Sequence, residues 1–101
     1  MNDRPVARSV NGVPIRLTAE RWQHIGRRHP EVALMQAKIR RAVAEPEAVH
    51  QGHAGTLLAV DRAADDLYLV VVYRETGVED GFVITAYLAR RLPSGRLIWK
   101  R

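Results

Sequence analysis

One hydroxyl, one phenol and three guanidinium groups are spaced in a way that suits phosphodiester chemistry. Side chains alternate between the two faces of a strand, so residues two apart share a face. Arginine binds phosphate through two parallel hydrogen bonds, a hydroxyl orients an oxygen, and tyrosine stacks on a base or donates a proton. Threonine and tyrosine are also good strand residues, so a purely structural role is the alternative. The candidates are Arg74, Thr85, Tyr87, Arg90 and Arg91.

A second cluster lies near the end of a predicted helix. His24 and Arg28 are one helical turn apart and share a face. His29 lies where the helix should end, and the helix dipole favours a protonated ring there. Either histidine is a candidate for acid–base catalysis, because histidine titrates near neutral pH. The alternatives are that His29 and Glu31 organise an interhelical corner and that His24 is a half-buried helix residue.

The sequence lacks the residue sets that other common kinds of site require. His50 and His53 have no carboxylate cluster nearby, which makes them a poor metal site. The sequence has no cysteine nucleophile, no serine elbow and no phosphate-binding loop with its lysine. We therefore expect neither a metal nor a cofactor.

Composition indicates one globular domain over residues 1–101, with residues 1–9 as a flexible tail. The net charge is +5, which favours contact with polyanions such as RNA. Arginine outnumbers lysine by 14 to 2, however, and a GC-rich genome would also produce that bias. No apolar run approaches the roughly 20 residues of a membrane helix, and the lack of cysteine is compatible with the reducing cytoplasm. We expect a cytoplasmic protein that does not contact a membrane.

The first half of the chain predicts a short edge strand and two helices. Residues 13–17 alternate apolar and polar side chains. Thr18 is a good N-cap for a helix over 19–28, which Pro30 should interrupt. Pro30 then suits the first turn of a second helix, over 30–44, whose apolar stripe includes Ile39.

The second half predicts strands. The central pair, 67–74 and 82–88, should run antiparallel, with Ile84 on the core face. The fold class is therefore α+β, with two N-terminal helices packed on one face of a four- to five-stranded antiparallel sheet. The remaining strand candidates are 48–50, 56–61 and 96–100.

Several of these stretches together resemble phage-associated nuclease-like proteins, of the group that unites barnase, EndoU, the colicin E5 and D nuclease domains and RelE. The resemblance covers residues 15–91, and its most specific parts are the His-Pro-Glu corner and the Thr-Ala-Tyr strand. It implies an RNA site on an open sheet face and metal-independent cleavage by the ribose 2′-hydroxyl. It implicates His24, His29, Thr85 and Tyr87, but no glutamate lies where a barnase-like base would be. The stretches are 15–25, 28–31, 44–47, 70–73 and 83–87.

These observations predict a small metal-independent endoribonuclease of the toxin or phage-effector type. Its partners would be RNA and a cognate antitoxin or immunity protein. The alternative functions are a non-catalytic nucleic-acid-binding domain and a phage or mobile-element interaction domain on the same scaffold.

Overall fold

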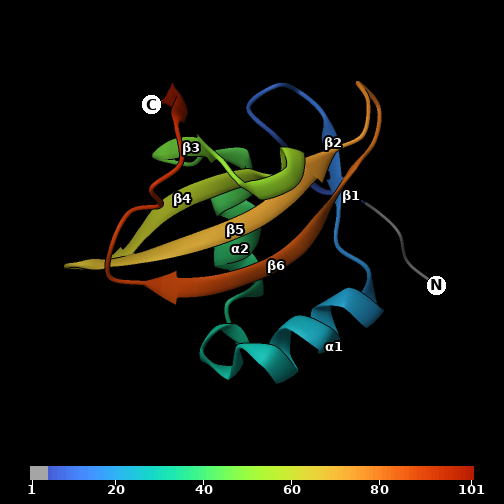
Figure 1. Cartoon of the computed structure of the whole chain (residues 1–101). Coiled ribbons are helices and arrows are strands. Elements are labelled where there is room, and N and C mark those ends of the chain that lie inside the picture. The colour runs from blue at the N-terminus through green and yellow to red at the C-terminus, as the bar shows by residue number, and fades with distance from the viewer. Residues whose placement is uncertain (1–4) are drawn as a thin grey trace.

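A computed structural model describes residues 5–101 and shows a seven-stranded sheet with two α-helices (Figure 1). The strand order across the sheet is β1-β2-β6-β5-β4-β3-β7. In chain order the elements are β1 (Pro5–Arg8), β2 (Pro14–Arg16), α1 (Ala19–Arg28), the 3₁₀ turn η1 (Pro30–Val32), α2 (Gln36–Ala44), β3 (Ala48–Gln51), the 3₁₀ turn η2 (His53–Gly55), β4 (Leu57–Ala64), β5 (Leu67–Glu75), β6 (Gly81–Ala89) and β7 (Leu97–Lys100).

The predicted sheet of four to five antiparallel strands was wrong. The sheet is mixed, because β2 pairs parallel with β6, and Figure 1 shows that it is curled. Pro5–Arg8, which we expected in a flexible tail, form β1 against β2, and residues 1–4 lie outside the described part of the chain. A parallel pair needs a long crossover, and the stretch from α1 to β5 supplies it here. Strands of three or four residues contain no local sequence pattern that would predict such a pairing.

The helices also do not share one face of the sheet. In Figure 1, α2 lies behind the sheet, where it contacts β1, β4 and β5, whereas α1 runs along β6. This arrangement is possible because β2 covers β6 only at Gly81 and Phe82. The rest of β6 is therefore bordered by α1 and η1.

Local signals predicted α1 correctly. The Thr18 hydroxyl accepts a hydrogen bond from the Arg21 backbone N–H at 3.1 Å, which caps the helix. The helix ends at Arg28, and the His29 backbone N–H donates to the Ile25 carbonyl at 2.7 Å. No helix in residues 5–101 is both long enough and apolar enough to cross a membrane.

The predicted helix over 30–44 is interrupted. Pro30–Val32 form a tight 3₁₀ turn, in which the Val32 N–H donates to the His29 carbonyl at 3.0 Å. This turn places Val32 in the core with no exposed surface. The α-helical hydrogen-bond pattern resumes only at Gln36.

The main core lies on the sheet face that α2 covers. Val71 and Tyr73 of β5 are fully buried there, and so is Ile39 of α2, as predicted. A bulge in the β5–β6 pairing changes the parity of β6, because Tyr73 pairs with Val83 while Val72 pairs with Thr85. Val83 is therefore buried in place of Ile84, which is only half-buried, so the prediction of Ile84 as a core residue was wrong.

The opposite sheet face, expected to be open, is partly covered. Val60 and Val70 lie on this face, and at most 1% of the surface of either residue is exposed. The segment between β6 and β7 is held against β3, because His50 Nδ1 lies 2.9 Å from the Gly95 carbonyl oxygen and the Gln51 N–H donates to the Arg96 carbonyl at 2.7 Å. On this face, Arg74 of β5 and Thr85 and Tyr87 of β6 remain partly exposed.

Candidate functional site

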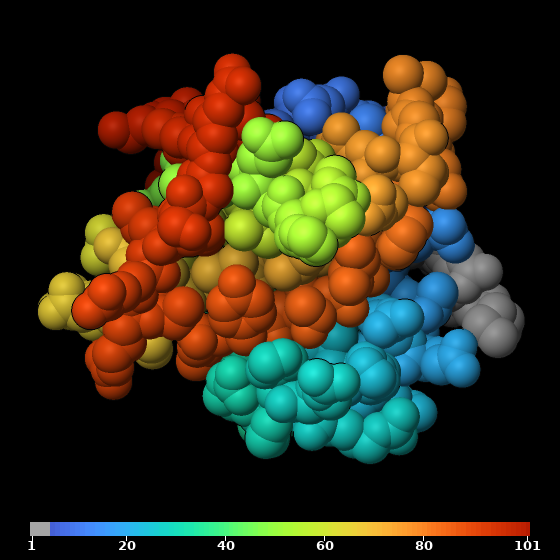
Figure 2. Space-filling model, viewed as in Figure 1, coloured from blue at the N-terminus to red at the C-terminus, as the bar shows by residue number. Residues whose placement is uncertain are grey.

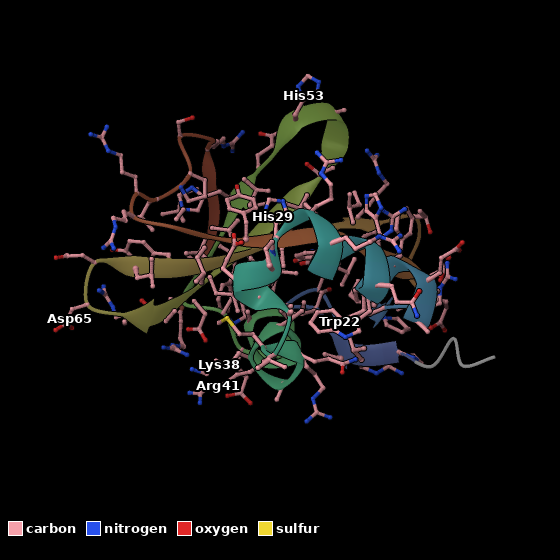
Figure 3. All side chains as sticks on the ribbon, turned by 90° about the horizontal axis from the view of Figure 1, so that it is seen from below. Trp22, His29, Lys38, Arg41, His53 and Asp65 are labelled. Atoms are coloured by element: carbon pink, nitrogen blue, oxygen red, sulfur yellow. The ribbon has the colours of Figure 1, made fainter. Side chains whose placement is uncertain are left out.

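The rings of His29 and Tyr87 form the centre of the candidate site. Their centroids lie 5.9 Å apart with an interplanar angle of 38°. His29 is the residue that caps the C-terminal end of α1, and Tyr87 is on the β6 face turned away from the main core. Figure 3 shows His29 at the junction of the first helix with the sheet. The two residues are 58 positions apart in the sequence, and the packing of α1 along β6 brings them together.

Glu31 lies beside the imidazole of His29. Its Oε2 lies 3.5 Å from His29 Nδ1, and both side chains are partly exposed. With Nδ1 facing this carboxylate, Nε2 is the ring nitrogen left for a ligand. The sequence offered a corner role and a catalytic role for His29 as alternatives, and this geometry is compatible with both at once.

Thr85 and Arg74 extend the site along the same face. Thr85 is two residues before Tyr87 and pairs with Val72, which is two residues before Arg74. The guanidinium of Arg74 is fixed, because its Nη2 donates to the Ala54 carbonyl oxygen of η2 at 2.6 Å. One hydrogen bond leaves most of the five guanidinium donors for a phosphate.

Sequence reasoning missed the contact between η2 and Arg74. Ala54 and Gly55 both have positive φ, 54° and 80°, which lets the turn bend back over the sheet. A Cβ at Gly55 would lie 3.2 Å from Arg74 Nη1, so the close approach favours glycine. The glycine at position 55 was the available signal of a tight turn. Local sequence does not show that this turn contacts Arg74 on β5.

His24 lies apart from the His29–Tyr87 pair. It lines a surface hollow of about 320 Å³ on α1 with Thr18, Glu20, Arg21 and Arg27. A neighbouring hollow of about 190 Å³ shares Thr18 and Arg21 and reaches Phe82 and Val83 at the start of β6. The structure therefore places only one of the two candidate histidines beside Tyr87.

Three arginines close to the central pair in the sequence have no fixed partner among the described residues. Arg28 immediately precedes His29, and Arg90 and Arg91 follow β6. All three are exposed, and none makes a side-chain hydrogen bond or ion pair with another residue of the described range 5–101. In Figure 2, β6 is exposed between η2 above it and the α1–η1 turn below it. The site thus combines a titratable ring, a phenol and a hydroxyl with free positive charge.

The other two histidines are not part of the candidate site. His50 is 8% exposed and contacts the Gly95 carbonyl oxygen, whereas His53 is exposed and points away from the sheet in Figure 3. Among the residues that the structure describes, no three histidine or acidic side chains are grouped as a metal site requires.

Comparison with known proteins gave no match, whether with protein-family models, with curated proteins or with solved structures.

Proposed function

We propose that this protein is a metal-independent endoribonuclease whose centre is the His29–Tyr87 pair. The contact between these rings, 5.9 Å between centroids, is the observation that carries the proposal. Cleavage of RNA by transesterification through its own 2′-hydroxyl needs groups that move protons and stabilise charge, and it needs no nucleophile from the protein. The residues around the pair supply groups of both kinds.

In the proposed reaction the ribose 2′-oxygen attacks the adjacent phosphorus. His29 accepts the 2′-hydroxyl proton at Nε2, and the phenol of Tyr87 donates a proton to the departing 5′-oxygen. The P–O5′ bond breaks, and the products are a 2′,3′-cyclic phosphate and a free 5′-hydroxyl. Arg74 neutralises the charge that develops on the phosphorane, and Thr85 holds the ribose-phosphate.

The free arginines extend this proposal to substrate binding. Arg28, Arg90 and Arg91 would hold phosphates on either side of the scissile bond. Because His24 lies apart from Tyr87, we assign it to RNA contact along α1 and not to proton transfer.

We place this activity in the cytoplasm, because a chain without cysteine is compatible with that reducing compartment. An active RNase there would attack the RNA of the cell that makes it. A cognate antitoxin or immunity protein is therefore the protein partner that we propose.

The decisive experiment is cleavage of RNA in EDTA, beside the same RNA with 2′-deoxy substitutions. We expect cleavage of the normal RNA to a 2′,3′-cyclic phosphate and protection of each substituted position. Equal cleavage of both substrates would exclude attack by the 2′-hydroxyl. If folded protein binds RNA but cleaves none, the non-catalytic nucleic-acid-binding function replaces this proposal. If it neither binds nor cleaves RNA, the alternative of a phage or mobile-element interaction domain is left.

A further inference from the structure

A second polar cavity lies between α2, β4 and the C-terminal residue. Its volume is about 290 Å³, close to the lower end of the roughly 300–1,000 Å³ typical of small-molecule sites. It shares no residue with the candidate RNase site. Its charged lining consists of Lys38, Arg41, Glu47, Asp61, Arg62 and Arg101.

Two of the four cations in this cavity are held in place. The Arg62 backbone N–H donates to Glu47 Oε2 at 3.0 Å, its Nε lies 3.9 Å from the same oxygen, and its guanidinium lies 5.1 Å from the centre of the Tyr68 ring. Arg101 donates from Nη1 to the Glu45 carbonyl oxygen at 3.2 Å and from its backbone N–H to the Glu47 carbonyl oxygen at 3.0 Å. These contacts orient both guanidinium groups and use the charge of Glu47.

The other two cations have no protein partner. Lys38 and Arg41 are three residues apart on α2, so they lie on one side of the helix. Within the described range 5–101, neither makes a side-chain hydrogen bond or an ion pair. Figure 3 shows them close together, on the opposite side of the molecule from His53. Two unpaired cations beside two oriented ones give the cavity an excess of positive charge.

Asp61 adds a hydrogen-bond acceptor to this positive surface. It is half-buried and, among the described residues, its carboxylate likewise makes no hydrogen bond or ion pair. With Glu47 and Asp61 counted against the four cations, the lining side chains retain two positive charges. That is the charge a phosphate monoester would neutralise near neutral pH, and the free carboxylate is suited to accept from a hydroxyl of the same ligand.

We propose that this cavity binds a small phosphate monoester that carries hydroxyl groups, a sugar phosphate in chemical class. Lys38 and Arg41 contact the phosphate together with Arg101, and Asp61 accepts a hydrogen bond from a sugar hydroxyl. A purely anionic ligand would leave the Asp61 carboxylate facing a like charge. The proposal does not depend on RNA cleavage.

Calorimetric titration with ribose 5-phosphate, inorganic phosphate and ribose tests the proposal. We expect ribose 5-phosphate to bind best, and its dissociation constant to rise about tenfold or more in a Lys38→Gln/Arg41→Gln variant, because charged hydrogen bonds are lost. Arg40→Gln is the matched control, since Arg40 is on the same helix but does not line this cavity; it lines the neighbouring groove on the β1 side, which also includes Arg41. Absence of binding to folded wild-type protein, or an equal loss in Arg40→Gln, would overturn the proposed site.

Asp61→Asn tests the hydroxyl contact separately. Loss of the negative charge should strengthen binding of inorganic phosphate. The preference for ribose 5-phosphate over inorganic phosphate should fall by a factor of about ten, because the hydrogen bond to the carboxylate is lost. An unchanged preference would show that Asp61 does not recognise the sugar.

Discussion

Arg16 and Asp80 form a two-point ion pair at the parallel junction of the sheet. Arg16 Nε lies 2.8 Å from Asp80 Oδ1, and Nη2 lies 3.1 Å from Oδ2. Arg16 pairs with Phe82 in the β2–β6 ladder, and Asp80 is the residue immediately before β6. The ion pair therefore holds β2 at the one end of β6 that it covers.

This ion pair should make stability depend on pH. Hydrogen bonding from Arg16 is the main cause that holds the pKa of Asp80 below its ordinary value of 3.8. A carboxyl group with a lowered folded-state pKa stabilises the protein above the unfolded-state pKa, and this contribution is lost as the pH falls through the folded-state pKa. The stabilities of wild type and Asp80→Asn in urea should therefore differ most near neutral pH, and the difference should shrink as the pH falls below the ordinary pKa of 3.8. A difference that stays constant from pH 7 to pH 2 would show that the carboxylate charge is irrelevant.

His29→Gln should abolish most of the proposed cleavage activity and spare RNA binding. Glutamine retains hydrogen bonding but cannot exchange a proton near neutral pH, so the single-turnover rate should fall by roughly 10²–10⁴-fold. Fluorescence anisotropy with an uncleavable 2′-deoxy-substituted oligonucleotide should show nearly unchanged affinity. His24→Gln is the control: a rate loss as large as that of His29→Gln would move proton transfer to His24.

Arg90 and Arg91 should contribute to binding through phosphates. Each phosphate contact that is lost should reduce the slope of log affinity against log salt concentration by about 0.7 for single-stranded RNA. The double Arg90→Gln/Arg91→Gln variant should therefore lose about 1.4 in slope, measured by anisotropy at several salt concentrations. An unaltered slope would remove both arginines from the interface. Arg96→Gln, just before β7, shows the effect of removing one positive charge elsewhere on the surface.

Tyr73→Phe should stabilise the protein. Tyr73 is fully buried, and its hydroxyl has no hydrogen-bond partner among the described residues. Burial is the main cause that raises the pKa of this phenol, with the nearby charge of Glu75 as a second cause. Removal of an unpaired buried hydroxyl should raise the free energy of unfolding by about 1 kcal/mol. A loss of stability on urea unfolding would show that the hydroxyl has a favourable partner.

Gly95→Ala should loosen the attachment of β7. A Cβ at Gly95 would collide with the carbonyl oxygen of Gln51, whereas Gly77 has no atom within 4 Å of the corresponding position. We expect Gly95→Ala to cost about 1–3 kcal/mol and to lower hydrogen-exchange protection in β7. Gly77→Ala is the matched control and should leave β7 protected. Equal protection in the two variants would contradict the close packing of this segment on β3.

The sequence by itself determined the elements whose causes are local. Thr18 and Pro30 define the limits of α1, because a cap and a proline act within one helical turn. The apolar run of β5 and the short connection to β6 predicted an antiparallel pair, which the structure contains. The same alternation correctly placed Thr85 and Tyr87 on the face away from the main core.

Tertiary structure decided whatever depends on pairing between distant segments. The bulge that buries Val83 in place of Ile84 is a property of the β5–β6 register, and the parallel β2–β6 pair joins strands separated by most of the chain. Alternation predicted a strand over 13–17, but not that β2 lies inside the sheet, between β1 and β6. The contact of His29 with Tyr87 likewise arises only when α1 packs along β6. Residue types therefore identified the candidate groups, but long-range packing selected which of them meet.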